Sequence, residues 1–371
     1  MSLLRTPLDA LHRELGARMV SFAGYEMPVQ YPAGIIREHE HTRDQAGLFD
    51  VSHMGQLLLE GAGSAELLDS LVPADVLGLP VDGQTYALLT NDAGGVRDDL
   101  IITRQGGERF FLVVNAACKA ADLAYLRERR RGQTLTALDD RALLALQGPA
   151  ARPVLAELAP ALSQLPFMRA RAVSIDGVDC YVSCSGYTGE DGFELSVPAG
   201  AAESLARRLL AEAAVALAGL GARDSLRREA GLCLYGHELG PGIDIVEAGL
   251  YWSVGKARRP GGEREGGFPG ARAIFERHRE GPGRRRVGLR VTGRRPVREG
   301  QRLFAPDGAA VGEITSACYA PSLGAPIAMA YVDAARAGAG SVLEADVRGK
   351  RLAVEVVSMP FVAQRYYRGP G

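Results

Sequence analysis

Two adjacent carboxylates stand just after a glycine turn in the segment 91–100, which reads NDAGGVRDDL. If Asp98 and Asp99 lie on a strand, their side chains point to opposite faces, and we expect one to be solvated and the other to point inward. An inward carboxylate beside apolar Leu100 has a raised pKa unless it meets a hydrogen-bond donor. That environment is typical of a ligand-binding or general acid/base group, while a turn-capping aspartate pair is the alternative.

A second glycine-rich turn at 185–194 reads SGYTGEDGFE and combines Tyr187 with three carboxylates, the last of them Glu194. The turn has no lysine, and its acids would repel a phosphate, so a phosphate loop is not indicated. A carboxylate here better suits a neutral ring with an amidine-like N–H edge, such as a pterin. A plain hairpin turn explains the same residues.

A third segment, 219–227, reads GLGARDSLR and runs from a glycine turn into a predicted helix, which Asp224 or Ser225 could cap. Arg223 stands at the mouth of this helix. A planar guanidinium there can form a forked pair with a carboxylate or carbonyl. The alternative is a surface arginine beside a helix cap.

Other kinds of chemistry have less support. His39, His41 and His53 match no metal-ligand spacing, so no metal site is expected. There is no G-x-S-x-G elbow, and Gly61 and Gly63 lack the third glycine of a dinucleotide-binding turn. The arginines at 284–286 have no interleaved aromatics, so no nucleic-acid partner is expected. The five cysteines follow no zinc or disulfide spacing and are interpreted as reduced thiols.

The length and composition of the chain limit the architectures that are possible. The chain has 371 residues, 47% hydrophobic and 23% charged, with a formal net charge of −1. These values indicate a globular protein of two or three domains without a bias toward nucleic acids or membranes. From 251 to 300 there are 14 Arg or Lys against 5 Glu, so this stretch suits an acidic partner, unless it is a solvated arginine-rich surface. No 18-residue apolar run or signal segment is present, and the cytoplasm of a bacterium is the simplest location.

The elements that must position these residues form an α+β pattern. The periodicity predicts helices over 6–20, 35–45, 118–131 and 201–217, and a strand, turn and helix over 56–72 with Ser64 as N-cap. A hairpin is predicted over 84–104, with further strands at 110–115, 171–184 and 193–197. Pro and Gly density predicts a linker near Arg284, and the short strands beyond it indicate a C-terminal β-barrel or sandwich.

Taken together, segments along essentially the whole chain resemble the glycine cleavage T-protein family. They are, in order, 6–8 (TPL), 16–20 (GARMV), 49–54 (FDVSHM), 91–100, 146–149 (LQGP), 186–190 (GYTGE), 222–227 (ARDSLR), 229–232 (EAGL), 268–270 (FPG), 315–316 (TS), 359–362 (MPFV) and 366–367 (YY). The resemblance implies three domains around a central folate channel. Residues 1–283 would form the folate-binding region of two interleaved, discontinuous domains, and residues 284–371 the C-terminal β-barrel domain.

The resemblance also implies roles for individual residues. Asp99 matches the family's catalytic carboxylate near folate N10 and N5. Glu194 and Arg223 match residues that bind the pterin end. The other expected folate contacts are Asn115, Tyr366, Tyr187, Met54 and Trp252.

The implied activity is an aminomethyltransferase of the glycine cleavage system. An aminomethyl group on the dihydrolipoyl arm of the H-protein would lose ammonia, and its carbon would pass to tetrahydrofolate as 5,10-methylenetetrahydrofolate. Tetrahydrofolate would be the co-substrate, without a metal, and lipoylated H-protein the transient partner. If the chain were a processed eukaryotic form, the mitochondrial matrix would be its location.

Two alternatives stay open. The same fold hosts folate-dependent demethylases and parts of larger dimethylglycine- and sarcosine-oxidising enzymes, although no flavin domain is attached here. A non-transferase folate-binding relative carries a reactive-looking K-G-C-Y-x-G-Q-E stretch. The corresponding residues 230–238 read AGLCLYGHE, with Cys233 but without the Lys and Gln, which favours the transferase.

Overall fold

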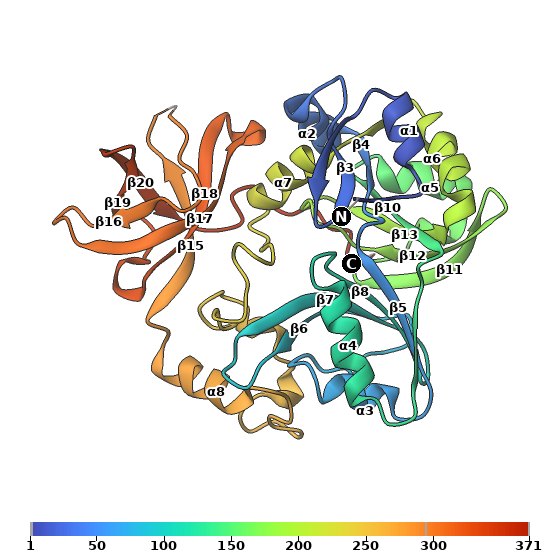
Figure 1. The fold of residues 1–371 in the computed structure, drawn as a ribbon, viewed down its shortest axis with the longest axis horizontal. Helices are drawn as coiled ribbons and strands as arrows, with labels where there is room; N and C mark the ends of the chain where they lie inside the picture. The colour runs from blue at the N-terminus through green and yellow to red at the C-terminus, as the bar shows by residue number, and fades with distance from the viewer. Residues whose placement is uncertain (1–2, 294, 370–371) are drawn as a thin grey trace.

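Three lobes surround the centre of the molecule in the computed structural model, which describes residues 3–293 and 295–369 (Figure 1). Each lobe has its own sheet and its own buried apolar cluster. Separate cores of this kind are what a chain of this length needs, because a single core rarely grows beyond about 250–300 residues.

The first lobe is built on a six-stranded sheet of order β11-β12-β13-β10-β4-β14. Its strands are β4 (Ala46–Asp50), β10 (Arg141–Gln147), β11 (Arg169–Ile175), β12 (Val178–Cys184), β13 (Gly192–Pro198) and β14 (Val215–Leu217). Residues of α1 (Asp9–Glu14), α5 (Ala151–Leu158) and α6 (Ala202–Leu210) share its buried core. A small sheet of β1 (Leu4–Arg5), β3 (Tyr25–Gln30) and β2 (Arg18–Phe22) completes the N-terminal part.

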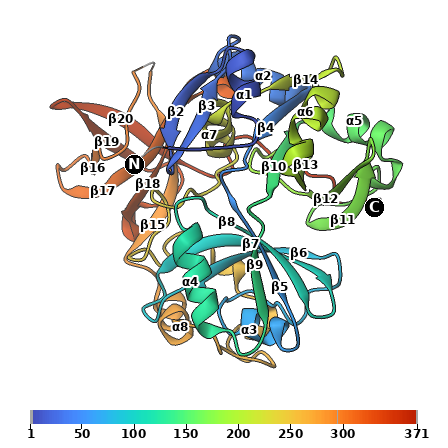
Figure 2. The ribbon, with the colours of Figure 1, turned by 45° about the vertical axis from the view of Figure 1, so that its right-hand side comes forward.

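The second lobe lies between two strands of the first in the sequence. After β4 the chain leaves to form the five-stranded sheet β6-β7-β8-β5-β9 and returns at β10. The strands are β5 (Gly55–Glu60), β6 (Gln84–Thr90), β7 (Val96–Gly106), β8 (Arg109–Val114) and β9 (Thr134–Ala137). Helices α3 (Ser64–Asp69) and α4 (Lys119–Arg129) pack on this sheet through residues such as Leu68 and Leu126 (Figure 2).

The third lobe is a closed six-stranded barrel of order β15-β18-β17-β16-β19-β20. Its strands are β15 (Arg284–Val291), β16 (Arg302–Phe304), β17 (Ala310–Ala320), β18 (Ala325–Asp333), β19 (Val342–Val347) and β20 (Lys350–Val357). Alternating residues such as Leu289, Ile314 and Val356 fill its interior. Of the two expected C-terminal architectures, the barrel is the correct one, and closure leaves no strand edge unpaired.

Two predicted helices are wrong in their extent, and one predicted N-cap is wrong. The helix expected over 6–20 is only α1, because 18–22 pair with β3 as strand β2. The helix expected over 201–217 ends with α6 at Leu210, and β14 follows it. Ser64 is not an N-cap, since the Ser64 and Ala65 amides donate to Glu108 Oε2 at 3.0 and 3.4 Å. That cap comes from a residue distant in sequence, which a local pattern cannot indicate.

Two further helices were only partly anticipated from the sequence. Helix α7 (Leu220–Glu229) begins before Asp224, so Asp224 and Ser225 lie in its interior and do not cap it. Asp224 instead pairs with Arg227 at 2.9 Å and Arg228 at 2.6 Å. Helix α8 (Ala271–Glu280) comes just before the linker expected near Arg284, where strand β15 begins. Among the described residues, no helix has both the length and the apolar character to cross a membrane.

Glu229 at the end of α7 joins the first lobe to the barrel. Its buried carboxylate accepts hydrogen bonds from His39 and Arg43 of α2 (Ile35–Asp44), at 3.1 and 2.9 Å, and from Ser322 Oγ at 2.7 Å in the turn between β17 and β18. Burial works against its charge, but the hydrogen bonds from His39 and Ser322 and the charge of Arg43 hold its pKa below the usual value. Glu229 is therefore one of the buried contacts that position the barrel against the first lobe.

We expect Glu229→Ala to lower the free energy of unfolding by about 3–5 kcal/mol at neutral pH, because it leaves the Arg43 guanidinium without this buried counter-charge. Urea unfolding followed by circular dichroism measures the change. The deficit should shrink as the pH falls below about 4, since a carboxylate with a depressed pKa stabilises the fold only while ionised.

The matched control is Glu280→Ala, which removes a glutamate whose side chain is 69% exposed. It should change stability by less than about 0.5 kcal/mol. Equal effects of the two variants would show that Glu229 does not hold the lobes together.

Candidate functional site

Asp98 and Asp99 lie on β7, as the sequence indicated, but neither is freely solvated. Their neighbours across the hairpin are Leu89 and Leu88 of β6. Asp98 has no exposed surface, and Asp99 on the opposite face is only partly accessible. The expectation of one solvated carboxylate is therefore wrong, because α4 packs over the face that carries Asp98.

The turn before these aspartates is fixed by tertiary contacts. Asn91 Oδ1 accepts the Ala93 and Gly95 amides, each at 3.0 Å, and its Nδ2 donates to the Pro241 carbonyl at 2.9 Å. A Cβ on Gly95 would lie 2.0 Å from that carbonyl oxygen, so only glycine fits. The strand leaves this turn in one register, which determines the faces on which Asp98 and Asp99 stand.

Burial and hydrogen bonding have opposite effects on the pKa of Asp99. Asn115, immediately after β8, donates from Nδ2 to Asp99 Oδ1 at 2.7 Å and to the Asp99 carbonyl at 3.1 Å. Burial and the negative charge of Asp98 raise the pKa of Asp99 to about 7, although hydrogen bonds from Tyr86 and Asn115 oppose the rise. A carboxyl with this pKa can gain or lose a proton near neutral pH.

Tyr86 is a neighbour of Asp99 that the sequence analysis did not single out. On β6 it stands on the same side as Leu88, the cross-strand partner of Asp99, and its hydroxyl hydrogen-bonds to Asp99. Trp252 stacks on the Tyr86 ring at 5.8 Å with an interplanar angle of 25°. Trp252 itself is 61% exposed, so it covers Tyr86 from outside. The hairpin register alone could have placed Tyr86 near Asp99.

Arg223, Tyr187 and Glu194 come together from three elements. The Arg223 guanidinium lies 4.8 Å from the centroid of the Tyr187 ring, and the charge of Glu194 acts on it. Burial lowers the pKa of Arg223, and its Nη1 is buried without a hydrogen-bond partner in the described structure. Glu194 Oε2 accepts from Ser185 Oγ at 3.0 Å. A buried guanidinium with a free N–H is suited to binding a polar ligand atom.

Tyr187 connects Arg223 and Glu194 to Asp99. The Tyr187 hydroxyl donates to the Cys233 carbonyl, and the charge of Asp99 contributes to the raised pKa of Tyr187. Cys233 and Tyr187 likewise act on the raised pKa of Tyr86. Asp99, Asn115, Tyr86, Tyr187, Arg223 and Glu194 therefore form one neighbourhood at the junction of the first two lobes. Burial raises the pKa of the Cys233 thiol to about 12, so it is not a reactive thiolate.

The two remaining predicted contacts lie in other surroundings. Tyr366 stacks on Phe167 at 4.0 Å with an interplanar angle of 9°, and burial raises its pKa to about 12. Met54 is partly buried and packs against the apolar cluster that contains Ala222 and Leu226 of α7. Neither residue contacts Asp99 in the structure, so their roles remain predictions.

The three histidines do not converge. His39 bonds to Ser225 and Glu229, His41 to the Ala214 carbonyl, and His53 packs edge-on to Phe22. Burial lowers the pKa of His53 to about 4, which keeps it neutral. In the described ranges no cluster of three or more His, Cys, Asp or Glu side chains is arranged to hold a metal ion.

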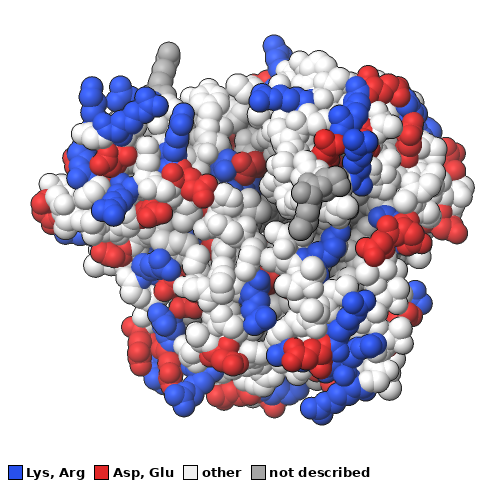
Figure 3. Space-filling model, viewed as in Figure 1, with Lys and Arg blue, Asp and Glu red and all other residues white. Residues whose placement is uncertain are grey.

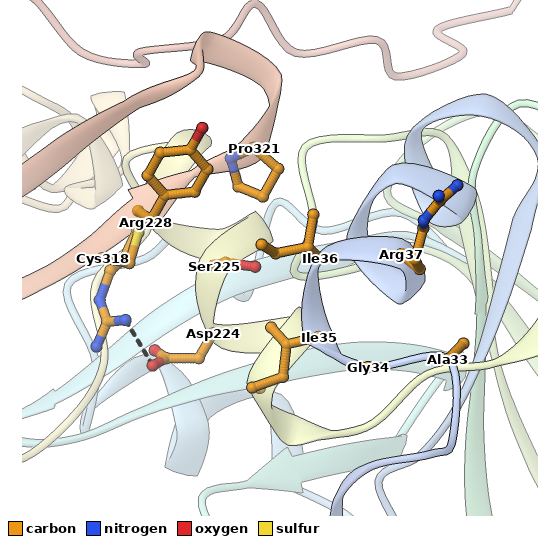
Figure 4. A pocket seen from close by; sticks show the side chains of 12 residues that line it. Ala33, Gly34, Ile35, Ile36, Arg37, Asp224, Ser225, Arg228, Cys318 and Pro321 are labelled. Atoms are coloured by element: carbon orange, nitrogen blue, oxygen red, sulfur yellow. Dashed lines mark ion pairs between the residues drawn. The ribbon is translucent and has the colours of Figure 1, made fainter. Parts of the chain in front are cut away.

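A groove of about 750 Å³ lies elsewhere, between the start of α2, helix α7 and the barrel strand β17 (Figure 4). Ile36 and Tyr319, each half-exposed, line it, and the ion pair of Asp224 with Arg228 borders it. None of the eight predicted site residues lines this groove.

Part of the excess of cations at 251–300 is neutralised within the molecule. Arg258 and Arg264 pair with Asp69, and Arg277 and Arg284 pair with Glu247. Figure 3 shows Lys and Arg interspersed with Asp and Glu over the face in view. The stretch gives little independent support for an acidic partner.

Comparisons with known proteins cover nearly the whole chain. Residues 8–258 match the family model described as the GCVT N-terminal domain, and residues 284–363 match the glycine cleavage T-protein C-terminal barrel domain. A mitochondrial aminomethyltransferase of Gallus gallus is 45% identical over 373 residues, with 98% of this chain and 94% of the relative covered. That of Dictyostelium discoideum is 41% identical over 383 residues, with the same coverage.

A solved structure has the same fold throughout. The glycine cleavage system aminomethyltransferase T from Bartonella henselae aligns with a TM-score of 0.93 and 43% identity. The alignment covers 99% of this chain and 100% of that chain. The lobes described above therefore have the arrangement found in that structure.

We expect the Asp99 carboxyl to titrate with a midpoint near pH 7, measured by ¹³C NMR on protein labelled at aspartate, with Asp99→Asn used to assign the resonance. Asn115→Ala should move the midpoint to higher pH, because it removes a donor to the ionised form. A midpoint near the usual value of about 4 would contradict the described environment.

The same shift predicts how stability depends on pH. Because Asp99 keeps its proton to higher pH in the folded than in the unfolded chain, its ionisation lowers the free energy of unfolding between about pH 4 and pH 7. Asp99→Asn should therefore be more stable than wild type by about 1–2 kcal/mol at pH 8, with no gain at pH 4.

Proposed function

The chain belongs to the glycine cleavage T-protein family, and we propose that Asp99 is the carboxylate on which its chemistry depends. The protein is an aminomethyltransferase enzyme of the glycine cleavage system. It releases ammonia from an aminomethyl group and transfers the carbon to tetrahydrofolate, giving 5,10-methylenetetrahydrofolate. The observation that carries the proposal is a partly accessible carboxyl with a pKa near 7, connected through Tyr187 to an arginine whose buried Nη1 has no partner among the described residues.

The residues near Asp99 fit a pterin ring. The free Nη1 of Arg223 can donate to a ring carbonyl, and the Glu194 carboxylate can accept from an amidine-like N–H edge. The Tyr187 ring under the guanidinium supplies an aromatic wall. When bound, tetrahydrofolate supplies the two nitrogens, N5 and N10, that receive the carbon. Asn115 and Tyr187 complete the proposed contacts, with Met54, Tyr366 and Trp252 as outer ones.

Asp99 would act by position and charge. Its carboxylate can accept a hydrogen bond from a ring or side-chain nitrogen of the folate and hold it in place. In the ionised form it can stabilise the positive charge that develops on the transferred carbon as ammonia leaves. Asn115 and Tyr86 hold the carboxylate in orientation, so little rearrangement is needed during the reaction.

The carrier of the aminomethyl group is proposed to be lipoylated H-protein. The dihydrolipoyl sulfur of the H-protein would carry the aminomethyl group. When the carbon passes to tetrahydrofolate, its bond to sulfur breaks to leave a free thiol, and the amino nitrogen departs as ammonia. This proposal depends on family membership rather than on the arginines of 251–300, several of which are paired internally.

The proposed organisation places the folate-binding region in residues 1–283 and the C-terminal barrel domain in residues 284–371. The proposed location is the bacterial cytoplasm, or the mitochondrial matrix for a processed eukaryotic form. The two named relatives are mitochondrial proteins.

Mixing the purified chain with tetrahydrofolate and methylamine-loaded H-protein should yield ammonia and 5,10-methylenetetrahydrofolate in equal amounts. Asp99→Asn should lower kcat by about 100-fold or more, because a neutral amide keeps the shape but cannot take a proton or stabilise a cation. Its affinity for tetrahydrofolate should change much less.

Two results would contradict the proposal in different ways. Normal turnover by Asp99→Asn would remove Asp99 from the chemistry. Tight folate binding by the wild type with neither product formed would favour a folate-dependent demethylase, which is then tested with methylated amine donors.

Arg223→Ala should raise the KM for tetrahydrofolate by about 10–100-fold, because it removes a charge-assisted hydrogen bond worth about 1.5–3 kcal/mol. The KM for H-protein should stay nearly constant. The matched control is Arg228→Ala on the same helix, whose guanidinium pairs with Asp224 beside the other groove. Equal effects of the two variants on folate would contradict the proposed pterin site.

A further inference from the structure

After the last barrel strand the chain returns to the first lobe. Residues 358–368, which follow β20, are here called the C-terminal strap. The strap is bonded at both ends: the Val362 amide donates to the Glu229 carbonyl at 3.0 Å, at the end of α7. Further along, the Phe167 amide donates to the Tyr367 carbonyl at 2.7 Å. The proposed function gives this segment only one outer folate contact, so its other contacts need an explanation.

Arg365 joins the strap to the glycine-rich turn that carries Tyr187 and Glu194. Its backbone amide donates to the Gly189 carbonyl at 2.8 Å. Its guanidinium forms a fork with the Glu190 carboxylate, with Nε 2.7 Å from Oε2 and Nη2 2.8 Å from Oε1. The Glu190 side chain is 1% exposed and that of Arg365 is 53% exposed, so the strap closes over a buried acid from outside. Paired bonds of this kind fix geometry as well as charge.

Arg43 of α2 holds the same turn from the inside. Its Nη1 donates to Glu190 Oε1 at 2.6 Å and to the Thr188 carbonyl at 2.8 Å. Its Nη2 donates to Glu229 Oε2 at 2.9 Å, and its own carbonyl accepts Arg365 Nη2 at 2.7 Å. Cations and acids therefore alternate from the strap through the turn to the end of α7. Arg365 is the member of this series that comes from the strap.

The turn, the end of α7 and the strap also pack closely on one another. A Cβ on Gly189 of the turn would lie 2.9 Å from the Cβ of Ala230, just after α7. A Cβ on Gly231 would lie 3.1 Å from the Cβ of Met359 in the strap. Both glycines have positive φ, 80° and 69°, which other residues adopt only with strain. This packing leaves the turn little freedom to move along α7 while the strap is in place.

The way the turn docks on α7 sets the geometry of the proposed pterin site. Tyr187 lies two residues before Gly189, and Arg223 lies on α7, about two helical turns before Ala230. The Arg223 guanidinium is 4.8 Å from the centroid of the Tyr187 ring. A shift of the turn relative to α7 would change this separation directly.

We propose that the C-terminal strap clamps the glycine-rich turn onto α7, and that Arg365 is a positioning residue for the pterin site. It acts through Glu190 and the Gly189 carbonyl and does not touch the folate. The inference rests on the proposed function, in which Arg223 and Tyr187 hold the pterin ring. It predicts that loosening the strap weakens folate binding more than it slows the transfer step or destabilises the fold.

The first test is the affinity of full-length Arg365→Gln for tetrahydrofolate, measured by titration calorimetry. The Kd should rise about tenfold or more, while kcat at saturating folate falls less than about threefold. Arg365→Lys keeps the charge and one bond to Glu190, so it should recover part of the affinity. The matched control is Arg336→Gln, which removes the same charge from an exposed pair with Asp307 and should leave the Kd unchanged. An unchanged Kd in Arg365→Gln would overturn the proposal.

A double-mutant cycle tests whether Arg365 acts through the pterin contact of Arg223. In the Arg223→Ala background that contact is already lost, so adding Arg365→Gln should change the Kd by less than about threefold. Additive effects of the two substitutions would mean that the strap acts elsewhere, and would overturn the proposal. Circular dichroism should show that Arg365→Gln melts within about 4 °C of wild type. If it does not fold, Arg365→Lys takes its place in the cycle.

Hydrogen exchange followed by mass spectrometry gives a readout that needs no ligand. Arg365→Gln should speed exchange in the turn at 185–194 by about tenfold, with strand β15 of the barrel unchanged. Arg336→Gln should leave the turn as it is in wild type. Unchanged exchange of the turn in Arg365→Gln would overturn the clamp even if folate affinity fell. If the wild type binds no tetrahydrofolate, the proposed function is wrong, while the exchange rates still decide whether the strap holds the turn.

Discussion

Adjacent carboxylates on one buried strand impose the main constraint on this structure. Asp98 and Asp99 cannot both be ionised out of water at low cost, so the surroundings must supply donors or a proton. Asn115 donates to both carboxylates, and Tyr86 hydrogen-bonds to Asp99. The outcome is a carboxyl with a pKa near 7, which is useful for chemistry and unfavourable for stability.

The arrangement of lobes brings that carboxyl to the groups that can hold a ligand. Asp99 belongs to the second lobe, Glu194 and Tyr187 to the first, and Arg223 to α7 between the first lobe and the barrel. Helix α7 is held in turn by Glu229, whose contacts reach α2 and the barrel turn at Ser322. A chain that crosses between lobes, as this one does after β4, lets distant segments meet in one site.

The sequence predicted the parts whose signals are local. The hairpin over 84–104, the strand at 110–115 and the short strands beyond Arg284 follow from alternation and turn residues, which left a barrel or a sandwich open. The family resemblance was confirmed by the comparisons. Features made by tertiary contacts were missed, such as the cap that Glu108 gives α3 and the internal pairing of the arginines at 258–284. Tyr86 was missed for the same reason, because its importance comes from burial next to Asp99.

The most direct test of the central claim is a crystal structure of the full chain with bound tetrahydrofolate. The account predicts that N10 and N5 lie beside the Asp99 carboxylate and that the pterin ring lies between Glu194 and Arg223, with Nη1 of Arg223 bonded to the ring. Folate bound instead in the groove beside Ile36, Arg228 and Tyr319, away from Asp99, would contradict it.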